Sequence, residues 1–207
     1  MSKIFLLKNK QKGFSLVEIL IVVAILGLIS VVLATFQVDI WRQNSFLTNS
    51  IQAEQDARIA LKRLVAELRQ AAPSDTGAFA IALADKDKLT FYSDIDGDGL
   101  HERLRYFLSG NILRRGILKP TGSPLTYLDA NEQVSNFVPN LVNSNSIIFT
   151  YFDKNYAGTS TALTLPINLP NVRLVKILFS IEADPNHAPV TTTYENQVSI
   201  RSLKDNL

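Results

Sequence analysis

The sequence predicts an α+β fold in which one long N-terminal α-helix packs on an antiparallel β-sheet domain with long loops. Three observations lead to this prediction. Residues 14–36 are almost all apolar, and residues 37–72 continue without Gly or Pro. Beyond Pro73, β-branched and aromatic residues recur in short runs separated by Gly, Asn, Ser and Pro, a pattern typical of strands and turns.

The first half of the predicted helix is long and apolar enough to cross a membrane. A bilayer core requires about 20 apolar residues in helical form. We therefore expect residues 14–36 to form a single transmembrane and assembly helix. The non-apolar residues inside this run are Ser15, Glu18, Gly27, Ser30 and Thr35.

A basic leader precedes the apolar run and predicts its orientation. Residues 1–13 contain four lysines and no acid, and the whole chain carries a net charge of +2. Positive charge before a membrane span stays cytoplasmic, so we expect the C-terminal part to be extracytoplasmic. Removal of the leader would leave +2 − 4 = −2, which argues against nucleic acid as a partner. The leader lysines are Lys3, Lys8, Lys10 and Lys12.

The second half of the predicted helix, residues 37–72, is amphipathic. Its apolar residues recur at helical spacing, and charged residues fill the other faces. Pro73 disfavours helix in the residue before it, so the helix is expected to run from Phe14 to about Ala71. The apolar stripe should pack on the sheet. Its members are Leu47, Ile51, Leu61, Leu64, Val65 and Leu68.

Residues 73–207 are predicted to form the β-rich extracytoplasmic domain. Gly110-Asn111 is a hairpin signal between two of the expected strands. Residues 116–146 and 154–171 are rich in Pro, Asn, Ser, Thr and Gly, and are expected to be long surface loops. The expected strands are 89–93, 103–108, 112–115, 147–152, 172–183 and 198–203.

The junction between leader and apolar run has a specific residue pattern. Lys12-Gly13-Phe14 is followed by Glu18 and an unbroken apolar helix. This resembles the N-terminal signature of type IV pilins and of the pseudopilins of type II secretion. The resemblance implies that a prepilin peptidase cuts between Gly13 and Phe14 and methylates the Phe14 amine. It also implies that Glu18 pairs with the Phe14 amine of a neighbouring subunit.

The same resemblance implies further partners and two departures from major pilins. Gly27 would let neighbouring helices approach closely. Thr35 stands where the family often has a proline, and the chain has no cysteine for the usual C-terminal disulfide. The implied partners are other minor and major pilins or pseudopilins, an inner-membrane assembly platform, and membrane lipid before assembly.

Looser similarities extend to one subfamily. Four segments are similar to J-type minor pseudopilins and related minor pilins, which implies a role at the tip or in initiation of a pilus or pseudopilus. The sequence does not distinguish secretion, motility and DNA uptake. The segments are Phe91–Gly99, Glu102–Tyr106, Leu113–Arg115 and Val198–Leu203.

Other interpretations of the N-terminus and of the function stay open. An ordinary signal peptide could be cut after Ala34, or the apolar run could be a plain signal anchor. A signal peptide, however, has an uncharged apolar region of only about 7–15 residues, which Glu18 and the length of the run contradict. A different function for the same architecture is a membrane-tethered, calcium-binding adhesin or surface-recognition module.

One acidic segment has the spacing of metal ligands. In Asp94-Ile95-Asp96-Gly97-Asp98-Gly99, carboxylates at positions 1, 3 and 5 precede a glycine at position 6, as at the start of a calcium loop. The Leu100 carbonyl and Glu102 would follow as ligands, but Arg105 stands where a bidentate Glu should be. The alternative is a turn whose aspartates accept hydrogen bonds from the backbone.

Nothing in the sequence predicts catalysis. The two histidines, His101 and His187, stand in different segments, and there is no cysteine, nucleophile elbow or phosphate loop. His101, beside the acidic segment, is either a further ligand or an exposed residue at the start of a strand. A local basic patch could form from residues on facing hairpin strands, although we expect a solvated face there. These residues are Arg103, Arg105, Arg114 and Arg115.

Overall fold

The computed structural model describes residues 13–143, 147–158, 161–182 and 191–203, with the backbone alone at 42–50. Residues 1–12 of the predicted leader and His187 lie outside these ranges. The chain divides after Leu47 into two compact units. The α+β prediction is confirmed, because a long N-terminal helix precedes antiparallel sheets.

Helix α1 runs without interruption from Leu16 to Arg69. It begins where the Ser15 carbonyl accepts a hydrogen bond from the Ile19 amide at 3.2 Å. Within the apolar half, the Thr35 hydroxyl donates to the Val32 carbonyl at 2.9 Å, so this polar group is satisfied inside the helix. The predicted ends, Phe14 and Ala71, are each off by two residues.

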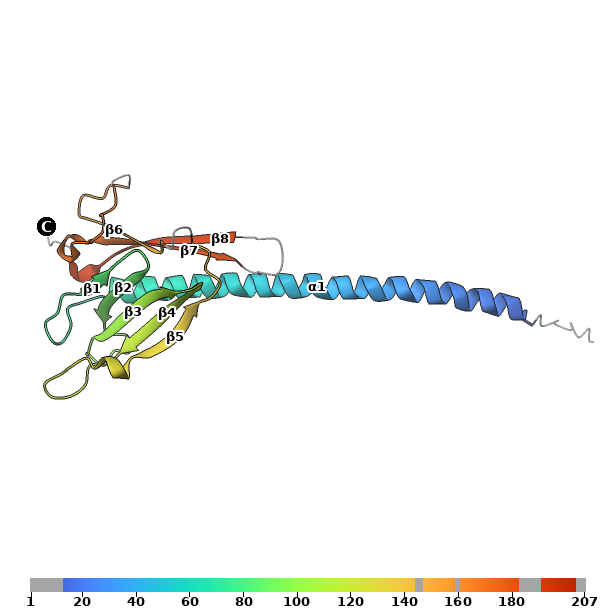
Figure 1. Ribbon diagram of the computed structural model, residues 1–207, viewed down its shortest axis with the longest axis horizontal. Helices are drawn as coiled ribbons and strands as arrows, with labels where there is room; N and C mark the ends of the chain where they lie inside the picture. Colours follow the sequence, from blue (N-terminus) through green and yellow to red (C-terminus); the bar gives the residue numbers. More distant parts are fainter. Residues whose placement is uncertain (1–12, 144–146, 159–160, 183–190, 204–207) are drawn as a thin grey trace, which may run out of the picture. The chain divides into compact units, whose positions relative to one another are not determined.

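The first sheet is a five-stranded antiparallel meander in the order β1-β2-β3-β4-β5 (Figure 1). The predicted hairpin is confirmed: Ser109 pairs with Ile112 across Gly110-Asn111, and Gly110 has a φ of 64°, which glycine adopts readily. The strands are β1 (Ile81–Ala84), β2 (Lys88–Ser93), β3 (Glu102–Ser109), β4 (Ile112–Leu118) and β5 (Gln133–Val138).

A second sheet of three strands, in the order β6-β7-β8, replaces the single sheet that we expected. It is also antiparallel, and a bridge between Leu141 and Ile181 connects its central strand to the segment after β5. The strands are β6 (Phe149–Phe152), β7 (Leu174–Glu182) and β8 (Thr191–Ser199).

The hydrophobic core lies where the C-terminal part of α1 meets both sheets. Four members of the predicted apolar stripe are buried, but Ile51 is 57% exposed and was wrongly included. The buried members are Leu61, Leu64, Val65 and Leu68. Strand β7 alternates buried and half-buried residues along its whole length, so one face contributes to the core. The sheet residues in the same cluster include Phe91, Leu104, Tyr106, Phe149, Val175, Ile177 and Phe179.

Three sequence-based assignments were wrong. The predicted loop 116–146 contains the end of β4 and all of β5, whose first four residues are exposed and so carry no apolar pattern. The predicted strand 198–203 is instead the end of β8, which starts at Thr191, followed by a 3₁₀ turn at Arg201–Leu203. Strand β1 was missed because only its first residue is buried.

Candidate functional site

The apolar half of α1 presents its side chains to the surroundings. Every residue from 13 to 41 is exposed, including Leu16, Val23 and Leu28. The apolar stretch Leu16–Trp41 has 26 residues, which at about 1.5 Å each extend about 39 Å. This exceeds the thickness of a bilayer core of about 30 Å. One N-terminal helix is therefore long and apolar enough to be a membrane anchor.

Glu18 and Gly27, the predicted assembly residues, both lie on the exposed apolar half of α1. Glu18 lies in the first turn of α1, where the helix dipole favours a negative charge. No described residue forms an ion pair or hydrogen bond with its carboxylate. A Cβ added at Gly27 would meet no atom within 4 Å. Both positions are therefore open to a second molecule.

The acidic segment forms the loop between β2 and β3. Asp94 accepts hydrogen bonds from the amides of Gly97 at 2.7 Å and Gly99 at 3.0 Å. Both glycines have positive φ, 76° and 87°, a conformation that L side chains rarely adopt. The backbone hydrogen bonds of the turn interpretation are thus present.

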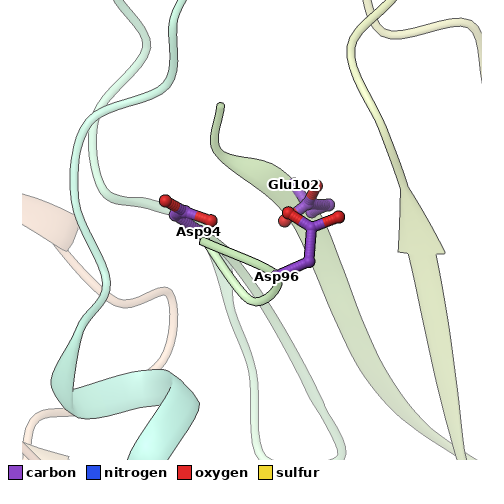
Figure 2. Close-up of side chains that lie close together, drawn as sticks. All are labelled: Asp94, Asp96 and Glu102. Carbon is purple, nitrogen blue, oxygen red and sulfur yellow. The ribbon is translucent and has the colours of Figure 1, made fainter. Parts of the chain in front are cut away.

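The loop also brings three of the five predicted metal ligands together. One carboxylate oxygen each from Asp94, Asp96 and Glu102 lies within 4.8 Å of the other two (Figure 2). Asp98 is not in this group, and its carboxylate accepts the Leu100 amide at 2.9 Å. Leu100 therefore joins the loop through its amide, and its carbonyl stays only a predicted ligand.

Glu102 is the one fully buried carboxylate of this group. Its Oε2 accepts a hydrogen bond from the Ile95 amide at 3.1 Å. Its Oε1 is buried and has no hydrogen-bond partner. The nearest charge recorded is the Lys119 ammonium, whose Nζ lies 3.5 Å from this oxygen. A buried acceptor without a hydrogen bond is unfavourable.

Lys119 was missed in the sequence, although the hairpin could have revealed it. Arg103 pairs with Leu118, so Lys119 follows directly opposite Glu102. Its ammonium donates to Asp96 and lies 3.5 Å from Asp98. The hydrogen bond with Asp96 raises the pKa of Lys119, and the same bond lowers the pKa of Asp96.

His101 belongs to a neighbouring interaction and not to the carboxylate group. Its amide donates to Asp75 at 2.6 Å, and its Nδ1 lies 3.1 Å from the same carboxylate. Desolvation opposes ionisation of Asp75, but the hydrogen bonds from His101 prevail and lower its pKa. The Tyr127 hydroxyl donates to the His101 carbonyl at 2.6 Å. The segments that carry Asp75 and Tyr127 are thus joined to the residue just before β3.

A buried polar network connects α1 to the first sheet. The Arg115 guanidinium donates to Glu67 at 2.7 Å and to the Tyr106 hydroxyl at 2.9 Å, and Tyr106 donates to Glu67. All three side chains are buried, and Arg115 is only 3% exposed. The expectation that the hairpin arginines form a solvated face was wrong for Arg115, because the register places it beside Tyr106.

Two of the other hairpin arginines are paired with acids. Arg103 donates to Asp129, and Arg105 donates to Glu132 at 2.8 Å from Nε. Arg105 therefore pairs with the residue just before β5. These pairs neutralise much of the local positive charge.

Burial of two tyrosines predicts alkaline sensitivity. Desolvation, together with nearby carboxylates, raises the pKa of Tyr106 and of Tyr151 well above 10. Above about pH 10 the unfolded chain loses these protons while the folded chain keeps them. The unfolded state then binds fewer protons, so the free energy of unfolding should fall as pH rises. Urea midpoints measured from about pH 8 to 11 would contradict this if they stayed constant.

The N-terminal part of the chain is similar to one protein family. Residues 8–34 match the family model of the prokaryotic N-terminal methylation motif. This match supports a type IV pilin-like precursor. No curated protein matches the chain. The matched segment includes Gly13, Phe14, Glu18 and Gly27, while the β-rich part lies outside it. The pilin-like family that this motif describes is a structural one.

Proposed function

We propose that the chain is a minor pilin or pseudopilin, a structural subunit of a type IV pilus or a type II secretion pseudopilus. A prepilin peptidase would cut after Gly13 and methylate Phe14. The subunit would then leave the inner membrane for a growing filament, helped by an assembly platform. Its folded domain would be extracytoplasmic, with the leader on the cytoplasmic side.

The observation that carries the proposal is the first turn of α1. A motif for N-terminal methylation precedes an exposed apolar helix, and Glu18 in that helix has no partner among the described residues. An isolated carboxylate is costly in hydrocarbon and is usually paired. The methylated Phe14 amine of a neighbouring subunit would supply the missing positive charge. Gly27 would permit close approach of the two helices.

The finer assignment to a J-type minor subunit rests on the hairpin region. Three of the four similar segments fall in one continuous stretch of the first sheet, from β2 through β3 to β4. The fourth covers the end of β8 and the 3₁₀ turn that follows. A minor subunit would act at the tip or in initiation.

Blocking the cut at Gly13 tests this function. Gly13→Val is expected to leave the full leader on at least nine tenths of the chain, because a branched side chain replaces the glycine that the resemblance places before the scissile bond. Gly27→Ala is the matched control, since its added methyl meets nothing within 4 Å and lies beyond the cut. The measurement is N-terminal sequencing and intact mass of the membrane-fraction protein.

The same measurement identifies the competing interpretations. The proposal requires the unaltered protein to begin at methylated Phe14. A start at Thr35 would indicate an ordinary signal peptide, and a start at Met1 would indicate a plain anchor. Either result would overturn the proposed function.

A further inference from the structure

We propose that the loop between β2 and β3 binds a calcium ion through Asp94, Asp96 and Glu102. This site does not depend on the proposed filament function, so either can fail alone. Its basis is Glu102, which contributes one carboxylate oxygen to the group of side chains shown in Figure 2 and whose buried Oε1 has no hydrogen-bond partner.

The burial of Glu102 explains why the site needs a cation. This side chain is 0% exposed, and only its Oε2 accepts a hydrogen bond. A buried carboxylate oxygen that accepts no hydrogen bond has lost its hydration without full compensation. Lys119 lies 3.5 Å from this oxygen, too far for a good hydrogen bond, because its ammonium is drawn to Asp96. A bound cation would satisfy the oxygen directly.

The backbone hydrogen bonds of the loop leave room for metal coordination. A carboxylate offers about four lone-pair sites. Asp94 uses its oxygens for two amides, and Asp96 accepts the Asp98 amide at 3.4 Å. Lone pairs therefore remain on both aspartates. The hydrogen-bonded turn is therefore compatible with metal binding. Its backbone hydrogen bonds orient the carboxylates that would bind the ion.

The ligand atoms favour calcium over other cations. Ca²⁺ takes oxygen ligands at about 2.3–2.6 Å in flexible geometry, which suits three carboxylates whose oxygens lie within 4.8 Å of one another. Magnesium demands near-octahedral geometry and usually keeps several waters. Zinc prefers nitrogen and sulfur, but the chain has no cysteine and His101 is held by Asp75.

The excess of negative charge at the loop also favours a bound cation. Asp94, Asp96, Asp98 and Glu102 bring four carboxylates to the loop and the start of β3, and the cation recorded beside them in the described part of the chain is the ammonium of Lys119. Lys119 has a long side chain that is 53% exposed, so it can move into solvent when an ion enters. Lys119 is therefore a displaceable competitor, and the ion would join the loop to the start of β3.

The test uses the full chain in detergent micelles, freed of metal with a chelator and titrated with calcium chloride. Calorimetry should show one binding event. The melting temperature should rise by about 5–10 °C at a hundred times the dissociation constant. Asp96→Asn, an exposed change, should weaken binding by about tenfold or more. Asp56→Asn, an exposed carboxylate on α1, is the matched control and should bind normally.

Lys119→Met distinguishes a calcium site from a loop whose negative charge is neutralised by Lys119 alone. If Lys119 competes with the ion, this variant should bind calcium at least severalfold more tightly and regain its stability when calcium is added. No binding by the original chain, or a variant that calcium does not stabilise, would overturn the proposal. So would binding that Asp96→Asn leaves unchanged. An equal response to magnesium chloride would overturn the assignment to calcium.

Discussion

Replacing Glu18 with alanine is expected to abolish incorporation of the subunit into filaments while leaving its membrane insertion intact. Breaking a buried ion pair by removing one partner costs about 3–5 kcal/mol. At about 1.4 kcal/mol per factor of ten, this is a loss of at least a hundredfold in assembly. The measurement is the amount of the protein in sheared filaments or in complexes recovered with partner pilins, relative to the membrane fraction.

Three controls make the Glu18 result specific. Asp39→Ala removes another exposed acid from the same helix and should leave assembly unchanged. Glu18→Gln keeps the shape but not the charge and should resemble alanine. Glu18→Asp keeps the charge and should restore part of the assembly. If Glu18→Ala reaches filaments as the original chain does, the pairing of Glu18 is wrong. If the original chain itself is absent from filaments and from complexes with partner pilins, the filament function is wrong and the alternative of a membrane-tethered recognition module gains.

Replacing Arg115 with methionine is expected to destabilise the folded domain by about 3–5 kcal/mol. The change leaves the buried Glu67 carboxylate without its 2.7 Å partner and removes a donor to the Tyr106 hydroxyl. Arg63 also donates to Glu67 at 2.9 Å. Because its side chain is mostly exposed, its charge cannot compensate for the loss of the buried Arg115 guanidinium. The measurement is urea unfolding of the full chain in detergent, followed by the near-ultraviolet circular dichroism of its tyrosines.

A neighbouring arginine and a double variant control this second prediction. Arg114→Met, on the other face of β4, should cost less than about 1 kcal/mol. Glu67→Gln combined with Arg115→Met should lose at least about 1 kcal/mol less than the sum of the single changes, because the stranded charge is then absent. Strictly additive losses would show that the three side chains do not act as one network.

The Glu67–Tyr106–Arg115 network shows how much of the site the sequence could have revealed. The Gly110-Asn111 turn sets the register, and that register places Tyr106 opposite Arg115 and Lys119 beside Glu102. Both pairs could therefore be predicted from the hairpin alone. Glu67 could not, because it looks like any exposed acid four residues after Arg63. Only the packing of α1 on the sheet buries it.

The acidic loop, too, could be predicted from the sequence only in part. Its ligand spacing is visible in the sequence, and so is the turn that its glycines permit. The full burial of Glu102, the separation of Asp98 from the oxygen group, and the pairing of His101 with Asp75 were not visible. These depend on which loops meet at the start of β3, and contacts between loops leave no periodic pattern.

By itself the sequence determined the membrane-length helix, its methylation motif, the position of Glu18 and the α+β class. All of these are local, because they depend on apolar runs, charge and turn residues at short spacing. Tertiary structure alone decided that the strands form two sheets, that β5 completes the first of them, and which charges are buried. Long-range pairing and burial decide such features, and a half-exposed strand such as β5 carries no apolar signal of its own.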